Sequence, residues 1–262
     1  MIFAAGKGTR LKPLTDIIPK ALVPVGDMPL IQRVYLRLVE AGAERVVVNV
    51  HHHAEQLKNY CEMLSAKYGV EIVISDESEE LLETGGALKH AAQELCKADR
   101  FIIHNCDILS NVDLKEFWYA GEEPDATLLV SERETQRYLI FDDTMRLVGW
   151  TNVKTEEVKS PFAEVHQAFN KDFISTEVPY SFVDFHPVPK PYYLYAFAGI
   201  HQMHSSLLKE MDHWPERFSV IDFYLEMCAT HDIRGYIQPD LQLLDVGKLD
   251  TLQQADGFLL SS

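Results

Sequence analysis

A short segment near the N-terminus combines residue types that suit the binding of phosphate. It reads Ala4-Ala5-Gly6-Lys7-Gly8-Thr9-Arg10 and directly follows an apolar run, Met1 to Ala4. Glycines that follow a strand let backbone N–H groups approach a phosphate chain without obstruction by side chains. Arg10 adds a fork of hydrogen-bond donors, and Lys20, in the dipeptide Pro19-Lys20, adds a point charge.

This segment matches neither of the common nucleotide-binding loops. It contains no G-K-[ST], which a Walker loop needs, and its glycines do not follow the G-x-G-x-x-G spacing. An ordinary strand-to-helix turn with solvated basic residues would explain a lone G-x-G. The combination of G-x-G-T-R with a later P-K is more specific, and it favours a loop that grips the phosphates of a nucleoside triphosphate.

Two aspartates, Asp107 and Asp245, each follow a run with the composition of a strand. Magnesium prefers oxygen ligands and usually takes one or two carboxylates together with phosphate oxygens and water. Ligands of α/β sheets bind beyond the carboxyl ends of the strands, so aspartates at strand ends on one rim can converge. The alternative is that each aspartate caps a helix. Beside a phosphate loop, the pair predicts a Mg²⁺ site.

Two further groups of reactive residue types have simpler explanations than catalysis. His51, His52 and His53 are consecutive, so their side chains point in different directions, and we expect a polar strand-to-helix connection rather than a metal cluster. Cys106, next to Asp107, has no apparent activating base. It is interpreted as a small residue at the end of a strand.

The elements that must position these residues alternate between strand and helix over the first 130 positions. Residue types and apolar spacing predict strands at 1–4, 45–50, 70–75, 100–105 and 126–131, and helices between Pro29 and Gly42 and at 54–67, 86–97 and 114–120. This alternation predicts an α/β fold, a Rossmann-like and mostly parallel mixed sheet with helices on both faces. The phosphate loop, His51 and Asp107 then lie on one rim.

The pattern changes beyond Arg133. We expect a hairpin of 138–141 and 146–150 around Asp142-Asp143, a strand at 193–201, a helix at 220–231, one or two strands within 233–246 and an amphipathic helix at 248–260. Residues 151–192 show no clear period and predict an irregular lobe near an acceptor site, within a single domain spanning 1–262. The aromatic residues of this region could stack on a ligand, or form the lobe's own core or an oligomer contact: Trp150, Phe162, Phe169, Phe173, Tyr180, Phe182, Phe185, Tyr192 and Tyr193.

The composition argues against several classes of partner. The chain has 24 Lys plus Arg against 40 Asp plus Glu, a formal net charge of −16, and we therefore expect no nucleic-acid partner. No apolar run approaches the ~20 residues of a membrane span, and the start lacks the features of a signal peptide. The four cysteines are scattered and predict reduced thiols in a cytoplasmic protein: Cys61, Cys96, Cys106 and Cys228. Self-association as a homo-oligomer stays open.

Taken together, the motifs resemble those of the sugar-phosphate nucleotidylyltransferases. The resemblance rests on the phosphate loop with Pro19-Lys20 and on Leu82-Glu83-Thr84-Gly85-Gly86, Asn105-Cys106-Asp107, Phe197-Ala198-Gly199-Ile200 and Leu244-Asp245-Val246-Gly247. The family includes mannose-1-phosphate guanylyltransferase. The Leu-Glu-Thr-Gly-Gly form is most similar to the short bacterial branch that includes N-acetylmuramate-1-phosphate uridylyltransferase. The resemblance implies the nucleotide-diphospho-sugar transferase fold.

The resemblance also implies a role for each matching residue. Ala4, Ala5 and the rest of the loop to Arg10 would hold the triphosphate, and Lys20 would contact the α-phosphate. Thr84, Gly85 and Gly86 would line the base and ribose pocket, where glycine lets the ring lie close to the backbone. Asp107 and Asp245 would hold the catalytic Mg²⁺, and Asn105 and Gly199 would border the sugar.

The implied reaction joins a nucleoside monophosphate, taken from an NTP, to a sugar-1-phosphate with release of pyrophosphate, as in nucleotide-sugar synthesis for cell-envelope polysaccharide. The chain departs from the family in two places. The E-K-P lysine is missing, with Lys154, Lys159 and Lys190 as scattered candidates, and Lys248 replaces the threonine of V-G-T. The alternatives are cytidylyl transfer to a non-sugar phosphate such as phosphocholine, and a non-catalytic subunit that binds sugar nucleotides.

Overall fold

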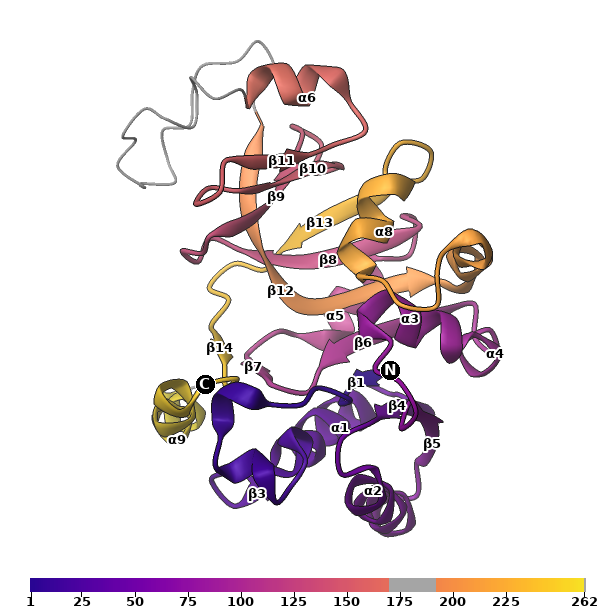
Figure 1. Ribbon diagram of the computed structural model, residues 1–262, viewed down its shortest axis with the longest axis vertical. Coiled ribbons are helices and arrows are strands. Elements are labelled where there is room, and N and C mark those ends of the chain that lie inside the picture. Colours follow the sequence, from indigo (N-terminus) through magenta and orange to yellow (C-terminus); the bar gives the residue numbers. More distant parts are fainter. Residues whose placement is uncertain (170–191, 262) are drawn as a thin grey trace.

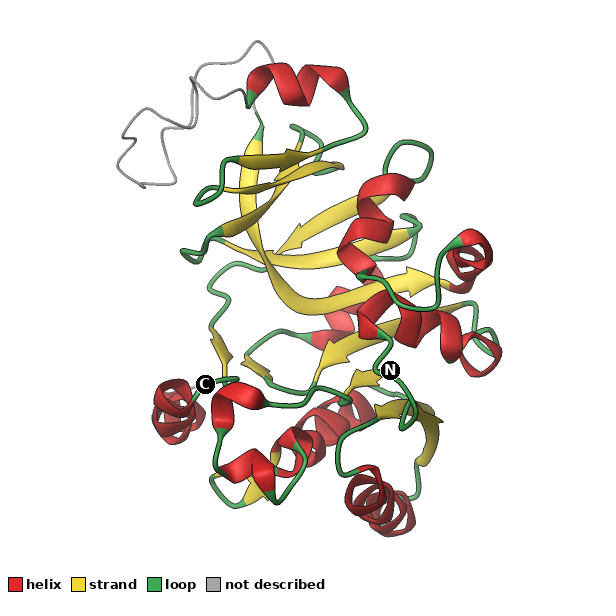
Figure 2. Ribbon diagram, in the orientation of Figure 1, coloured by secondary structure: helices red, strands yellow, loops and turns green. Residues whose placement is uncertain are grey.

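The computed structural model describes residues 1–169 and 192–261, which form a ten-stranded mixed sheet flanked by helices (Figure 1, Figure 2). The parallel part of the sheet runs in the order β6 (Arg100–Asn105), β1 (Ile2–Phe3), β4 (Arg45–Val50) and β5 (Glu71–Asp76). The bounds of β4 and β6 are those predicted. The three carboxyl ends that precede the phosphate loop, His51 and Asp107 therefore lie on one rim, as expected.

The valines of β4 show that both faces of the sheet are covered. Val47 packs into a core that includes α3 (Glu83–His90) and α8 (Val220–Met227), whereas Val46 and Val48 pack into a second core with α1 (Leu30–Glu40), α2 (Ala54–Tyr68) and α5 (Leu114–Ala120). Successive side chains of a strand point to opposite faces. The continuous β-branched run of β4 thus reflects burial on both sides, and the predicted fold class is confirmed.

The helix predicted at 86–97 begins earlier and is broken. It consists of α3, which starts at Glu83, and a short α4 (Ala92–Leu95) separated from it by Ala91. Glu83 has a φ of 62°, in the left-handed region. The sequence placed the start three residues too late, because Glu83, Thr84 and Gly85 show no apolar spacing. Thr84, Gly85 and Gly86 therefore lie in the first turn of a helix.

The antiparallel half of the sheet is built around one long strand, β12 (Tyr193–His204), which curves through the centre of Figure 1. Its start pairs with β9 (Arg137–Phe141), its middle and end pair with β8 (Ala126–Ser131), and its end also pairs with β6. Because it contacts both halves, β12 joins the hairpin region to the parallel strands.

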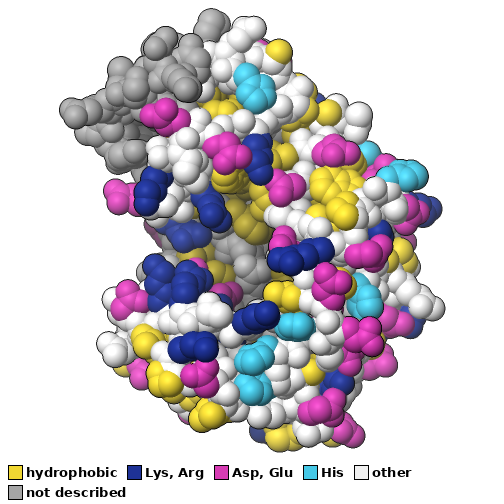
Figure 3. Space-filling model, viewed as in Figure 1, with side chains coloured by type: hydrophobic (Ala, Val, Ile, Leu, Met, Phe, Trp, Pro, Cys, Tyr) yellow, Lys and Arg dark blue, Asp and Glu magenta, His cyan; other side chains and the backbone are white. Residues whose placement is uncertain are grey.

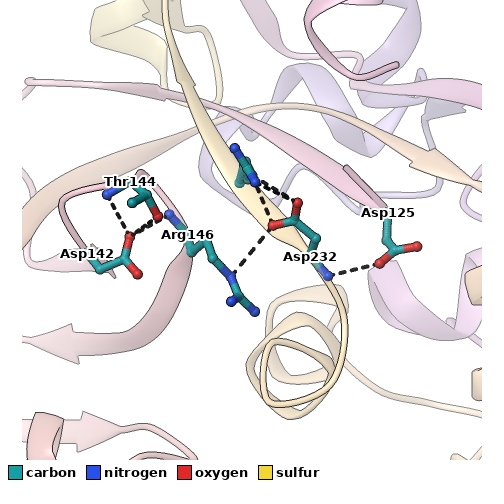
Figure 4. Close-up of polar contacts among 6 residues, drawn as sticks. Asp125, Asp142, Thr144, Arg146 and Asp232 are labelled. Atoms are coloured by element: carbon teal, nitrogen blue, oxygen red, sulfur yellow. Dashed lines mark hydrogen bonds and ion pairs between the residues drawn. The ribbon is translucent and has the colours of Figure 1, made fainter. Parts of the chain in front are cut away.

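The predicted hairpin is formed by β9 and β10 (Leu147–Asn152). In the turn, Oδ1 of Asp142 accepts hydrogen bonds from the backbone N–H groups of Thr144, at 2.9 Å, and Arg146, at 3.0 Å (Figure 4). Arg146 in turn forms an ion pair with Asp232, Nε to Oδ1 at 3.6 Å, and the backbone N–H of Asp232 donates to Asp125. The Arg146–Asp232 ion pair, together with a hydrogen bond from the Gly235 N–H to the Met145 carbonyl at 2.9 Å, joins the hairpin to the strand that follows Asp232, β13 (Ile233–Ile237).

The described part of the irregular lobe contributes β11 (Glu157–Lys159) and α6 (Ala163–Ala168). Phe169 and Tyr192 are buried against each other, with ring centroids 5.8 Å apart, and Phe162 packs against the same cluster. These aromatic residues form the lobe's own core. Four of the other predicted aromatic positions lie outside the described residues: Phe173, Tyr180, Phe182 and Phe185.

The C-terminal part of the chain returns to the phosphate-loop side of the molecule. β14 (Leu243–Asp245) pairs antiparallel with β7 (Ile108–Ser110), and α9 (Leu249–Ser261) packs on apolar side chains of the N-terminal region, among them Leu11 and Val23. The remaining short elements are η1 (Thr9–Leu11), η2 (Leu14–Asp16), η3 (Lys20–Leu22), β2 (Pro24–Val25), β3 (Met28–Pro29) and η4 (Ser205–His213). Within the described ranges, no helix is long and apolar enough to cross a membrane.

Candidate active site

The phosphate loop leaves β1 at Ala4 and folds back on itself at Gly8. Gly6, Lys7, Thr9 and Arg10 are exposed, so the loop presents its backbone and basic side chains to solvent. Gly8 has a φ of 61°, and its carbonyl oxygen accepts hydrogen bonds from the Leu11 N–H and the Thr15 hydroxyl, each at 2.8 Å. These bonds fix the turn.

Gly8 also brings Lys20 against the loop. A Cβ at position 8 would lie 2.8 Å from Cγ2 of Thr15 and 3.0 Å from Cβ of Lys20, closer than side chains pack. The absence of a side chain at Gly8 is therefore what lets the stem of Lys20 approach. This contact places the lysine that the sequence singled out directly beside the phosphate loop.

Lys20 and Asp107 form a mostly buried ion pair. Nζ of Lys20 donates to Oδ2 of Asp107, and the two side chains are 11% and 17% exposed. Burial on its own lowers the pKa of Lys20, but the negative charges of Asp107 and Asp245 outweigh that effect, and the net pKa is raised. Lys20 is thus a fixed cation at the end of β6.

Asp245 lies beside Asp107, but the strand that places it there is not the one expected from the sequence. We expected a strand end on the rim of the main sheet, whereas β14 lies outside that sheet and pairs with β7. The Val246 N–H donates to the carbonyl of Asp107 at 2.9 Å, so the backbones at the two aspartates are hydrogen-bonded neighbours. Neither aspartate caps a helix, because Asp107 lies between β6 and β7 and Asp245 lies four residues before α9.

Gly247 marks the point where the charged groups meet. A Cβ there would lie 2.7 Å from Oδ1 of Asp245, 2.8 Å from Nη2 of Arg10 and 3.3 Å from Nζ of Lys20. One face of the molecule is hollowed, and Lys and Arg side chains gather on the rim of the hollow (Figure 3). Two cations and two carboxylates therefore converge beside the exposed loop, although the chain as a whole is strongly acidic.

The arrangement suits a magnesium ion bound together with phosphate. Across 1–169 and 192–261, no group of three or more His, Cys, Asp or Glu side chains could hold a metal ion without other ligands. Mg²⁺ needs only one or two carboxylates when phosphate oxygens and water complete its octahedron. Asp107 and Asp245 supply hard oxygen ligands of that kind, so the residues fit the ion.

Thr84, Gly85 and Gly86 contact another part of the chain. The Thr84 hydroxyl accepts a hydrogen bond from the Val220 N–H at 2.9 Å, and a Cβ on Gly85 would lie 2.3 Å from the ring of Phe218. A Cβ on Gly86 would lie 2.1 Å from the carbonyl oxygen of Glu216. The glycines thus make room for segment 216–220, a packing role that the sequence did not indicate. Contact of these residues with a nucleotide stays a prediction.

Asn105 and Gly199 lie close together on two neighbouring strands, β6 and β12. Gly199 has a φ of 77°, and a Cβ on it would lie 2.8 Å from Nδ2 of Asn105. The pairing of β12 with β8 shifts register between Phe197 and His201, so the strand bulges around Gly199. The bulge leaves the Asn105 side chain room beside the carboxyl end of β6.

Several of the remaining reactive residues have structural partners. Burial raises the pKa of Cys106 to about 12, so the thiol stays protonated and is a poor nucleophile. His51 contacts the carbonyl of Glu77 at 2.6 Å, whereas His52 contacts that of Thr15 at 3.3 Å. Lys159 pairs with Asp222, Nζ to Oδ1 at 3.0 Å. Lys190 lies outside the described residues, and Lys248 is exposed directly after Gly247.

Sequence reasoning missed two polar residues behind the loop, Asn49 and Glu77. Oδ1 of Asn49 accepts a hydrogen bond from the Ala4 N–H at 2.7 Å, and its Nδ2 donates to Glu77 at 2.9 Å. For Asn49 a signal was present in the sequence, since it interrupts an otherwise β-branched run. A buried amide in such a strand requires hydrogen-bond partners.

Comparisons with known proteins identify the family of the N-terminal half of the chain. The profile of the family described as nucleotidyl transferase matches residues 1–138. An N-acetylmuramate α-1-phosphate uridylyltransferase from Caulobacter vibrioides is 42% identical over 127 residues, which are 48% of this chain and 50% of the relative. A mannose-1-phosphate guanyltransferase from Yarrowia lipolytica is 36% identical over 138 residues, 51% of this chain and 38% of the relative. The matched region thus spans half or less of these relatives.

The solved structures extend the likeness to nearly the whole chain. A putative glucose-1-phosphate thymidylyltransferase from Bacillus anthracis superposes with a TM-score of 0.72 and 16% sequence identity, over 98% of this chain and 93% of the other. At this identity the likeness shows that the fold is shared. It includes the part of the chain beyond residue 138, which the family profile does not reach.

Proposed function

Since the chain belongs to the nucleotidyl transferase family, we propose that it transfers a nucleoside monophosphate from an NTP to a sugar-1-phosphate, giving an NDP-sugar and pyrophosphate. The observation that carries the proposal is the convergence of Arg10, Lys20, Asp107 and Asp245 around Gly247, beside an exposed glycine loop. This site has cations for phosphates and carboxylates for a metal ion. In the described chain, its one cysteine, Cys106, is held in the unreactive thiol form.

The reaction needs positioning and charge neutralisation more than covalent chemistry. An oxygen of the sugar phosphate attacks the α-phosphorus in line, the bond to the β,γ-pyrophosphate breaks, and pyrophosphate leaves. The loop amides and Arg10 bind the outer phosphates, and Lys20 donates to the α-phosphate, where charge develops. When bound by Asp107 and Asp245, Mg²⁺ supplies further neutralisation of the phosphate charge.

The acceptor side is proposed at Asn105 and Gly199, with the lobe of 151–192 next to it in a single domain. The names of the relatives favour N-acetylmuramate-1-phosphate with UTP, or mannose-1-phosphate with GTP, as substrates. Either product would serve nucleotide-sugar supply for cell-envelope polysaccharide. The four cysteines are free thiols, which supports a reducing, cytoplasmic setting.

A screen for pyrophosphate release tests the proposal. The four NTPs and dTTP are each combined with Mg²⁺ and with mannose-1-phosphate, glucose-1-phosphate, N-acetylmuramate-1-phosphate or phosphocholine. We expect release with at least one sugar-1-phosphate. Release with phosphocholine alone would replace the sugar assignment by cytidylyl transfer to a non-sugar phosphate. Binding of a nucleotide sugar without any release would identify a non-catalytic subunit.

A further inference from the structure

A buried carboxylate lies behind the phosphate loop. Glu77 follows β5 directly and is 3% exposed. Its Oε1 accepts a hydrogen bond from Nδ2 of Asn49 at 2.9 Å, and its Oε2 accepts one from the Leu82 N–H at 3.3 Å. Its own backbone N–H donates to the carbonyl of Val50 at 2.8 Å. Both carboxylate oxygens therefore accept hydrogen bonds from within the protein, and the buried Glu77 side chain does not face a ligand.

The hydrogen bonds of Glu77 join three segments at the rim of the sheet. Asn49 lies in β4 and also accepts the N–H of Ala4, the first residue of the phosphate loop, at 2.7 Å. Leu82 is the residue before α3, whose first turn holds Thr84. A continuous chain of bonds thus runs from Ala4 through Asn49 and Glu77 to Leu82.

We propose that Glu77 is a positioning residue that fixes the phosphate loop and the start of α3 relative to each other, so that one nucleotide can contact both. The inference rests on the proposed function, in which Ala4 to Arg10 bind the triphosphate and Thr84 to Gly86 border the base. It adds a residue that touches neither substrate but sets the spacing between the two parts of the nucleotide site.

The chemistry of the chain of bonds requires a carboxylate at position 77. The Ala4 N–H can only donate, so it fixes the amide oxygen of Asn49 on its side and turns the amide NH₂ toward Glu77. Leu82 also presents an N–H. Two donors therefore face one side chain, and an ionised carboxylate accepts from both. Burial raises the pKa of Glu77, and the hydrogen bonds from Asn49 and Leu82 oppose that rise by favouring the ionised form.

Glu77→Gln tests the inference because it keeps the shape and removes one acceptor. The amide NH₂ of glutamine must face either Asn49 or the Leu82 N–H, and a donor then faces a donor. Titration calorimetry with Mg²⁺ would compare UTP, GTP, ATP, CTP and dTTP, and then the tightest of these with its nucleoside and with tripolyphosphate. We expect the affinity for the whole nucleotide to fall roughly tenfold, and that for each fragment to fall less than about threefold.

This split separates positioning from general loosening of the fold. A merely structural role would weaken the fragments and the whole nucleotide alike, and would lower the melting temperature together with binding of the sugar phosphate. Glu79→Gln is the control, because Glu79 is an exposed carboxylate in the same loop. Wild-type nucleotide affinity in Glu77→Gln overturns the inference and leaves the proposed function standing. A wild-type chain that binds none of the five nucleotides overturns the proposed function itself.

A reciprocal double variant keeps the test decisive if Glu77→Gln does not fold. In Asn49→Asp with Glu77→Gln, aspartate accepts from Ala4 and from the glutamine NH₂, and the glutamine oxygen accepts from Leu82. Every hydrogen bond is restored with the same total charge. We expect the double variant to bind the nucleotide within about threefold of wild type, whereas Asn49→Asp alone loses affinity. A folded double variant that binds as weakly as the single variants contradicts the inference.

Discussion

The glycines of the phosphate loop differ in what surrounds the missing Cβ. Gly8 needs a positive φ and faces Thr15 and Lys20 at contact distance, whereas nothing lies within 4 Å of a Cβ on Gly6. Gly8 is therefore required by the loop's own structure. The fold does not require a glycine at position 6. A ligand that approaches the loop from solvent would require it, and in the proposed function that ligand is a phosphate.

We expect Gly8→Ala and Gly6→Ala to fail in different ways. Gly8→Ala should lower the melting temperature and weaken nucleotide binding, because the turn and the Lys20 contact are both disturbed. Gly6→Ala should leave the melting temperature unchanged and weaken only nucleotide binding. Thermal unfolding and calorimetry on the two variants check this, and a stable Gly8→Ala variant with full affinity contradicts the account of the loop.

Lys20→Ala should lower the turnover number at least ~100-fold, because one donor aimed at developing charge is worth on the order of 3–4 kcal/mol. Lys12→Ala is the matched control, since Lys12 lies on the same segment but forms an exposed ion pair with Asp16 at 2.9 Å. It should keep activity within about twofold. Pyrophosphate release and thermal unfolding are measured together, because Lys20→Ala also leaves Asp107 without its partner. Near wild-type turnover in a folded Lys20→Ala variant removes the lysine from the mechanism.

Most site residues could be named from the sequence, but their contacts could not. Gly6, Gly8, Arg10, Lys20 and Asp107 stand out by type and spacing. The direct Lys20–Asp107 ion pair depends on how the chain folds over 87 positions, which no local pattern encodes. Glu77 escaped notice for the same reason, because its two side-chain partners come from different segments.

At the scale of elements, the sequence predicted best where one physical cause dominates. The predicted bounds of β4, β6, β8 and α5 were correct, because each has a strong apolar pattern that stops at residues typical of turns or helix caps. The start of α3 was placed too late because its first residues show no apolar spacing, and no local pattern shows that Gly85 and Gly86 pack against Phe218 and Glu216. The pairing of β7 with β14 was not predictable, since three-residue strands carry too little pattern to identify a partner.

The final helix offers a test at this scale. Gly257 lies in α9, is exposed, and has nothing within 4 Å of an added Cβ. Gly257→Ala should raise the free energy of unfolding by about 1 kcal/mol through helix propensity. Gly42→Ala is the matched control, because the space there is equally open but φ is 102°, so the free energy of unfolding should fall. Urea denaturation of both variants checks the signs.

At the scale of the whole molecule, two buried histidines couple stability to pH. Burial lowers the pKa values of His104 and His201 to about 3, from 6.5. Below pH 6.5 the unfolded chain binds protons at these positions and the folded chain does not. The free energy of unfolding therefore falls as the pH is lowered from 6.5 towards 3, by about 1.4 kcal/mol per pH unit for each histidine.

His201→Gln isolates one of these contributions. Glutamine can still hydrogen-bond the hydroxyl of Tyr224, which lies 2.6 Å from Nδ1 of His201, but it does not titrate. Between pH 6 and pH 4 the variant should lose stability less steeply than wild type, by about 1.4 kcal/mol per pH unit. All other titrating groups are common to both chains. Equal slopes in urea titrations would show that His201 is protonated in the folded state.

The pairing of β7 with β14 has a consequence for biosynthesis. Arg10 comes from the first residues of the chain and Asp245 from near the end of the sequence, and both lie within reach of Gly247. During translation the site cannot assemble until the ribosome has released the segment around Asp245. Contacts so distant along the chain also raise the contact order and slow folding. A chain that ends before Asp245 would therefore lack one of the two carboxylates beside the phosphate loop, and the proposed activity would require that synthesis has passed Asp245.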